Sequence, residues 1–197
     1  MDNEILNAED KDFNRVWEIM KEVSAAERHF NELETKYRIL ASQWLLASFA
    51  GIGFVLTAKT DLPFNNLWVV IGICLVSAVG IFQLWRMDLI VYHQLLHAAF
   101  SEGVKLENTF PFLPQIKNQM LHSQKGSDVT KSLVYYYSGS VSLLLVMGGV
   151  AFLILKYSLL SNIEIILIIF SLSAVTILIN IYMRKKSVEK SSEIKIS

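Results

Sequence analysis

The chain has 197 residues, of which 53% are hydrophobic and 18% charged, and its formal net charge is zero. A soluble domain typically carries about 25% charged residues, so this composition argues against an ordinary water-soluble protein. The neutral charge balance gives no reason to expect direct nucleic-acid binding. The single cysteine, Cys74, excludes an intramolecular disulfide.

Residues 1–38 form a polar region that opens with MDNEILNAEDKDF, an acidic stretch without the basic and apolar parts of a signal peptide. We therefore expect the first apolar segment to serve as the insertion signal. From residue 13 onward, apolar side chains recur every three or four positions, which predicts an amphipathic helix. No proline or glycine interrupts residues 13–50, so this helix is expected to run directly into the apolar segment. Its apolar face packs either on its own chain or on neighbouring subunits.

Four apolar segments of 19 to 23 residues contain no charge: 39–57, 67–85, 133–155 and 165–183. About 20 helical residues are needed to cross a bilayer core of about 30 Å. The segments do not alternate between polar and apolar residues, as the strands of a membrane barrel would. They predict an all-α polytopic membrane protein with two transmembrane hairpins, residues 39–85 and 133–183. Small residues in SFAGIG, SGS and MGGVA favour close helix packing.

The lysines and arginines are distributed asymmetrically along the chain. Three regions hold all of them except Lys59 and Lys156: residues 1–38, 86–132 and 184–197. Cytoplasmic loops of membrane proteins carry an excess of these residues. Both termini and the middle region are therefore expected in the cytoplasm, with short turns at 57–66 and 157–164 on the other side.

The middle region, residues 86–132, begins as a continuation of the second apolar helix and is interpreted as a cytoplasmic helical collar. The helix is expected to reach residue 106 or 107 and to stop before NTFPFLP, because a proline disfavours helix in the residue before it. Residues 115–132, which include the turn signal KGSD, predict a short helix and a link to the third segment. The last region, 184–197, is a basic cytoplasmic tail.

Polar side chains that share one face of this continued helix, at 100° per residue, are candidates for a pore lining or a subunit seam: Gln83, Arg86, His93 and His97. A solvated helix face is the competing interpretation. Arg86 and His93 also fit loosely the arginine–histidine spacing of HEPN-type ribonucleases, which favours a membrane-tethered ribonuclease as a minor alternative.

The histidines at positions 93 and 97 have the spacing of two metal ligands and would need a third, such as Glu102 or His122. No HExxH sequence surrounds them, and the chain has no phosphate-binding loop or nucleophile motif. We expect no metal, no cofactor and no enzymatic activity.

The middle region contains the pattern Y-x2-LL-x-AAF-x2-G-x-x-LE followed by PFLP. This pattern resembles the RipA-like family of small bacterial four-span inner-membrane proteins, which form octamers. The chain also resembles, in its overall plan, the membrane accessory proteins of type VI-B CRISPR systems. The matching positions are Tyr92, Leu95, Leu96, Phe100, Glu107 and Pro111. Ala99 stands where the family commonly has a lysine.

The resemblance implies a homo-oligomeric, ring-like protein of the bacterial inner membrane, an octamer in the family. It implies a pore or permeability effector in antiphage defence, accessory to an RNA-guided CRISPR nuclease. The alternative is a membrane scaffold or regulator that recruits a soluble partner through its cytoplasmic helices. The two-span SLATT effectors share the pattern of helix, hairpin and cytoplasmic helix, but they normally lack the second hairpin.

Overall fold

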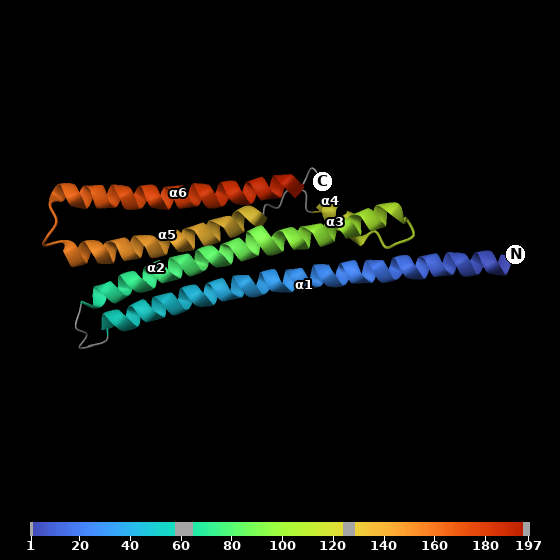
Figure 1. Cartoon of the computed structure of the whole chain (residues 1–197), viewed down its shortest axis with the longest axis horizontal. Helices are drawn as coiled ribbons and strands as arrows, with labels where there is room; N and C mark the ends of the chain where they lie inside the picture. The colour runs from blue at the N-terminus through green and yellow to red at the C-terminus, as the bar shows by residue number, and fades with distance from the viewer. Residues whose placement is uncertain (1, 58–64, 124–128, 195–197) are drawn as a thin grey trace. The chain divides into compact units, whose positions relative to one another are not determined.

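The computed structural model describes residues 2–57, 65–123 and 129–194, and these residues form helices and turns without a strand (Figure 1). In chain order the helices are α1 (Asp2–Thr57), α2 (Asn66–Trp85), the π-helix η1 (Arg86–Tyr92), α3 (His93–Thr109), α4 (Ile116–Ser123), α5 (Val129–Lys156) and α6 (Asn162–Ile194). Among the described residues, four helices are long and apolar enough to cross a membrane. The prediction of an all-α chain with four membrane-spanning helices is thereby confirmed by length and composition.

The chain divides into two compact units. The polar unit comprises Met1–Thr35 and Val91–Ser127, and the span unit comprises Lys36–Ile90 and Asp128–Ser197. Helix α1 continues from one unit into the other without a break, as the absence of proline and glycine in residues 13–50 predicts. The predicted turn residues 58–64 and the KGSD signal at 125–128 lie outside the described residues.

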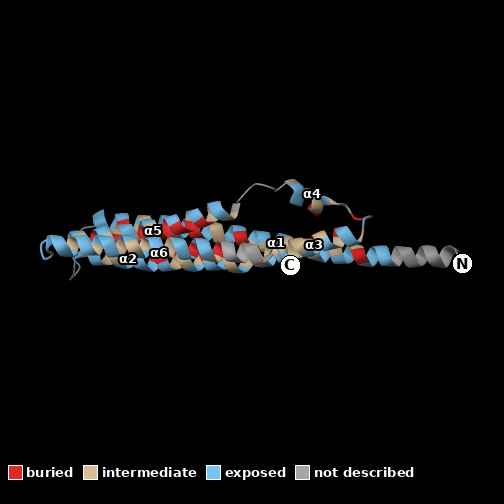
Figure 2. Cartoon of the chain, turned by 90° about the horizontal axis from the view of Figure 1, so that it is seen from above, coloured by how far each residue is buried: buried red, intermediate tan, exposed pale blue. Residues whose placement is uncertain are grey.

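In the span unit, α5 lies between α2 and α6 (Figure 1). Figure 2 shows buried residues concentrated along α5. The larger core cluster forms where the apolar faces of α1, α2, α5 and α6 meet, and its fully buried members are Ala41, Ile81, Trp85, Tyr137, Leu144 and Met183. A smaller cluster surrounds Cys74, which is fully buried. The sides of these helices that face away from the core remain apolar and exposed, as expected of helices in contact with lipid.

Small residues allow the spans to approach one another. A Cβ atom at Gly80 would lie 2.7 Å from the indole of Trp44, so only glycine admits this ring between α1 and α2. A Cβ at Gly149, within the MGGVA stretch, would lie 2.3 Å from Cδ2 of Leu172 in α6. Hydrogen bonds between hydroxyl and amide side chains add to this packing, because such groups find few alternative partners in lipid. Ser48 donates to Ser77 at 2.7 Å, and Asn180 donates to Ser142 at 2.7 Å.

The helix ends follow local capping chemistry. The side chain of Asn65 accepts a hydrogen bond from the amide of Leu67 at 2.9 Å and caps α2. At the start of α6, Ser161 and Glu164 form a capping box, in which the Glu164 carboxylate accepts from the Ser161 amide at 2.8 Å. These hydrogen bonds hold the pKa of the Glu164 carboxyl below its usual value.

Helix α3 ends at Thr109, two to three residues later than predicted. Phe110 has φ of −122° and ψ of 86° and donates its amide hydrogen to the carbonyl of Leu106 at 2.9 Å. Because Pro111 constrains only the residue directly before it, the helix continues through Thr109. The short helix predicted within residues 115–132 is confirmed as α4.

Candidate functional site

A buried carboxylate lies at the end of the second span. Asp88 has no exposed surface, and its Oδ2 accepts hydrogen bonds from Arg38 Nε at 3.1 Å and from the Tyr137 hydroxyl at 2.9 Å. Arg38 directly precedes the first predicted span, and Asp88 follows the second by three residues. A buried charge is tolerated only where an opposite charge and hydrogen bonds compensate its desolvation. The cluster of Arg38, Asp88 and Tyr137, called here the buried triad, therefore joins α1, η1 and α5 at one level.

The π-helix η1 places Asp88 in this position. Its i→i+5 hydrogen bonds give a turn wider than the 3.6 residues of an α-helix. Asp88 and Leu89 are both buried, whereas Arg86 is exposed. The face predicted at 100° per residue therefore does not continue unchanged from Gln83 to His93, because the seven residues of η1 alter the angular spacing.

The four predicted pore or seam candidates have different surroundings. Gln83 and Arg86 are exposed. His93 is half-buried, and its Nδ1 lies 3.0 Å from Oε1 of the buried Glu34 of α1. His97 lies twelve residues after Trp85, and its Nδ1 is hydrogen-bonded to the Ser101 hydroxyl at 3.1 Å. Burial, together with the charge of His93, lowers the pKa of His97 below its usual value.

The pattern residue Glu107 has a defined structural role. Its carboxylate is almost fully buried and accepts hydrogen bonds from the backbone amides of Lys117 and Asn118, both at 2.8 Å. These amides belong to the first turn of α4, where they have no partner within the helix. The negative charge of Glu107 therefore caps α4 and interacts favourably with the helix dipole. It holds α4 against the end of α3.

Lys117 connects three further residues of the polar unit. Its ammonium group is paired with the carboxylate of Glu27 in α1 and lies 5.6 Å from the ring centroid of Phe100. A Cβ at Gly103 would lie 2.3 Å from both Cδ and Cε of Lys117. Only glycine at this position leaves room for the lysine side chain to pack across α3. Of the six pattern positions, Phe100 and Glu107 thus take part directly in packing α4 on the unit.

The remaining pattern positions differ in their exposure. Tyr92 and Leu96 are half-buried, Leu95 is 42% exposed, and Pro111 lies in the exposed turn that joins α3 to α4. The structure therefore assembles part of the pattern in one place, around Lys117, and leaves Leu95 on the surface.

Several large apolar side chains of the polar unit are exposed, although this unit lies outside the predicted spans: Phe13, Ile19, Leu95, Phe112, Ile116, Met120 and Leu121. We call them the apolar surface of the polar unit. Next to Ile116 is a cavity of about 180 Å³, which is lined mainly by α1 residues including Trp17, Met20 and Arg28. This surface and cavity suit contact with another apolar surface better than contact with water.

A second cavity, of about 300 Å³, lies within the span unit. Carbon atoms line most of it, from Ile71–Leu75 of α2, Leu144–Phe152 of α5 and Ile168–Val175 of α6. The Ser171 hydroxyl donates to the carbonyl of Ile168 at 2.9 Å, so it is satisfied within its own helix. The cavity offers no arrangement of polar groups for catalysis.

Among the described residues, no group of three His, Cys, Asp or Glu side chains is placed to hold a metal ion. The predicted pair His93 and His97 instead engages Glu34 and Ser101, within the polar unit.

Sequence reasoning missed the buried triad. The sequence did contain a signal, because Arg38 and Asp88 carry opposite charges close to neighbouring span ends in a predicted hairpin. That signal does not distinguish a buried pair from two hydrated side chains near the membrane surface. The third member, Tyr137, is one of three consecutive tyrosines, and only the rotation of α5 identifies which of them reaches Asp88.

Comparisons with protein families, with characterised proteins and with solved structures gave no match to this chain.

Proposed function

We propose that this chain is the subunit of a homo-oligomeric, ring-like assembly of the bacterial inner membrane, which acts as a pore or permeability effector in antiphage defence. The apolar surface of the polar unit is the observation that supports an oligomer. Ile116 is 61% exposed, Phe112 55% and Leu121 47%. These residues lie outside the four candidate spans. Large apolar side chains that gather on the exposed surface of one unit favour a protein interface.

Copies inserted in one membrane with one orientation present their polar units at the same height. The apolar surface of one copy is then met by the polar unit of its neighbours, and repetition of this contact closes a ring. The antiphage role and the association with an RNA-guided nuclease rest on the resemblance of residues 92–111 to the RipA-like pattern.

The conducting part of the proposal rests on Gln83 and Arg86. Both are exposed at the end of the second span. In a ring such side chains face a neighbouring subunit, a central opening or the lipid headgroups, and the proposal assigns them to the opening. His93 and His97 are engaged within the subunit and are weaker candidates for the lining.

One observation favours the alternative of a scaffold that recruits a soluble partner. The cavity of about 180 Å³ beside Ile116 is large enough for one apolar side chain, and Trp17 contributes an aromatic wall. A soluble protein with an apolar anchor could occupy it in place of a second copy.

The test compares the full-length protein with the double variant Phe112→Glu, Ile116→Glu in detergent. We expect the wild type to give a closed ring in electron microscopy class averages and the variant to dissociate into monomers. Asn108→Glu, Gln119→Glu, which adds the same charge at exposed polar positions of the same unit, is the control and should retain the ring.

The same three proteins are then expressed in cells exposed to phage, with the partner nuclease present. We expect membrane depolarisation with the wild type and the control but not with the variant. Monomeric wild-type protein contradicts the oligomer. A ring that leaves the membrane potential unchanged contradicts the pore. If the wild type binds one soluble protein and the variant does not, that result would support the scaffold instead.

A further inference from the structure

A cationic site lies where α5 begins and α6 ends. Arg184 directly follows the fourth predicted span, and its Cζ lies 4.4 Å from the ring centroid of Tyr135 in α5. Both side chains are exposed, Tyr135 by 56%. Stacking on the aromatic ring restricts the guanidinium and leaves its edge available for hydrogen bonds. The arginine is therefore ordered near the surface of the span unit.

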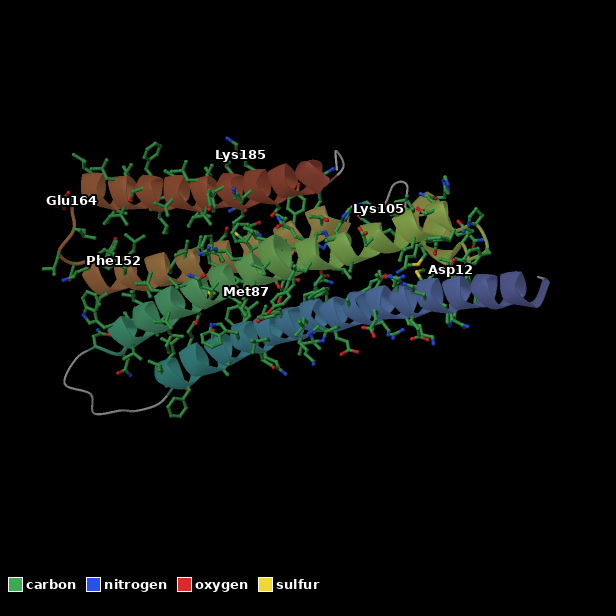
Figure 3. The ribbon with its side chains drawn as sticks, turned by 45° about the vertical axis from the view of Figure 1, so that its right-hand side comes forward. Asp12, Met87, Lys105, Phe152, Glu164 and Lys185 are labelled. Carbon is green, nitrogen blue, oxygen red and sulfur yellow. The ribbon has the colours of Figure 1, made fainter. Side chains whose placement is uncertain are left out.

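Further basic residues lie near this pair in the sequence. Lys131 precedes Tyr135 by four residues and shares its face of α5. Lys185 and Lys186 follow Arg184, and Figure 3 shows Lys185 directed away from α5. Residues 128–137 and 180–190 together hold five basic and two acidic residues, the latter being Asp128 and Glu189. The balance of charge in these two stretches is therefore positive and favours an anion.

A buried hydroxyl lies one turn beyond Arg184. Ser187 is 3% exposed, and its Oγ has no hydrogen-bond partner in the part of the chain that the structure describes. A buried polar group without a partner is costly, but this hydroxyl is closed to the surface and takes no part in the exposed site.

We propose that Arg184, Lys131 and Tyr135 form a binding site for the phosphate headgroup of an anionic phospholipid. The position is that of a membrane interface, because Arg184 directly follows one predicted span and Tyr135 lies two residues inside the start of another. The neighbouring Ile181 and Tyr182 are 55% and 52% exposed and provide an apolar surface for the acyl chains. The site needs no second subunit and is therefore independent of the proposed ring and pore.

The experiment measures lipid binding to the full chain by native mass spectrometry, with phosphatidylglycerol and phosphatidylcholine of the same acyl chains. We expect the wild type to prefer phosphatidylglycerol. Each cation near an anionic headgroup contributes roughly a fivefold preference. The variant Arg184→Gln should therefore lose about fivefold of the preference, and Arg184→Gln, Lys131→Gln about 25-fold. Arg184→Lys, which keeps the charge, should retain most of it.

The chain offers a matched control at the opposite ends of the spans. The Lys156 ammonium lies 5.9 Å from the ring centroid of Trp68, so it is also a cation over an aromatic ring. Residues 150–164 hold no second cation and include Glu164, so their net charge is zero. Lys156→Gln should therefore change the lipid preference much less than Arg184→Gln does. Circular dichroism should show that all the variants keep the helix content and melting of the wild type.

Three results would overturn the proposal. The first is equal binding of the two lipids by the wild type, and the second is an unchanged preference in the double variant. The third is displacement of phosphatidylglycerol by millimolar inorganic phosphate, which would identify a soluble anion as the ligand instead of a lipid. None of these results bears on ring formation, which the variants of Phe112 and Ile116 test separately.

Discussion

At the scale of single residues, the carboxylate of Asp88 combines full burial with two partners on other helices, Arg38 and Tyr137. Removal of one member of a buried ion pair leaves the other charge uncompensated, which is more damaging than loss of an exposed pair. The pair formed by Glu102 and Lys105 at 3.2 Å is of the exposed kind, because both side chains are more than half exposed. We therefore expect neutralisation of the acidic residue to lower the free energy of unfolding more in the buried pair than in the exposed pair.

We expect Asp88→Asn to lower the free energy of unfolding by about 3 kcal/mol, since Arg38 loses its counter-charge in a partly buried position. Tyr137→Phe removes one hydrogen bond to a charged acceptor and should lower it by about 2 kcal/mol. Glu102→Gln should change it by less than about 1 kcal/mol. Unfolding of the purified variants in mixed micelles measures all three. Equal stability of Asp88→Asn and Glu102→Gln would show that the buried triad does not stabilise the chain.

At the scale of the elements, two local devices determine where helices end and how they pack. The π-helix η1 turns Asp88 and Leu89 inward at the point where the second span ends. The carboxylate of Glu107 caps α4 and thereby fixes the polypeptide after the turn that contains Pro111. In both cases one acidic side chain connects elements that are separate in the sequence.

Glu107→Ala is expected to loosen the first turn of α4, because the amides of Lys117 and Asn118 lose their acceptor. A helix cap contributes about 1–2 kcal/mol, so the exchange of these two amide hydrogens should accelerate by roughly tenfold. Hydrogen exchange followed by nuclear magnetic resonance or mass spectrometry measures the effect. Glu102→Ala on the exposed side of α3 is the control and should leave both rates unchanged. Unaltered protection of these amides in Glu107→Ala would contradict the capping role.

At the scale of the whole molecule, the arrangement of charges predicts which parts of the chain face the cytoplasm. Residues 1–38, 86–132 and 184–197 carry all of the basic residues except Lys59 and Lys156. Cys74 is the single cysteine and is buried within the span unit, so a background without cysteine needs only the change Cys74→Ser. Single cysteines can then report on each side of the membrane.

In that background, Ser158→Cys should react with a membrane-impermeant maleimide in intact spheroplasts. Asn108→Cys should react only after the membrane has been opened. Both positions are exposed, so a difference between them reflects sidedness and not burial. The reverse labelling pattern would place the termini and the middle region outside the cytoplasm, and labelling of both in intact spheroplasts would contradict a four-span topology.

The sequence by itself determined the helical class, the four candidate spans and the continuity of the first helix. These features follow from length, hydropathy and the placement of proline and glycine, which act locally and need no knowledge of neighbouring helices. The same holds for the end of α3 near Pro111, which was predicted within three residues.

Only the tertiary structure decided which polar residues meet. The pairing of Arg38 and Tyr137 with Asp88 depends on the rotation of three helices and on the wide turn of η1, which a period of 3.6 residues does not reveal. The partner of His93, Glu34, likewise comes from a helix distant in the sequence, whereas Glu107 is bound by amides of the next helix, ten and eleven residues further on. Hydropathy determines that a helix is buried in a membrane, but it does not determine which face the helix presents, because that choice depends on packing against the other helices.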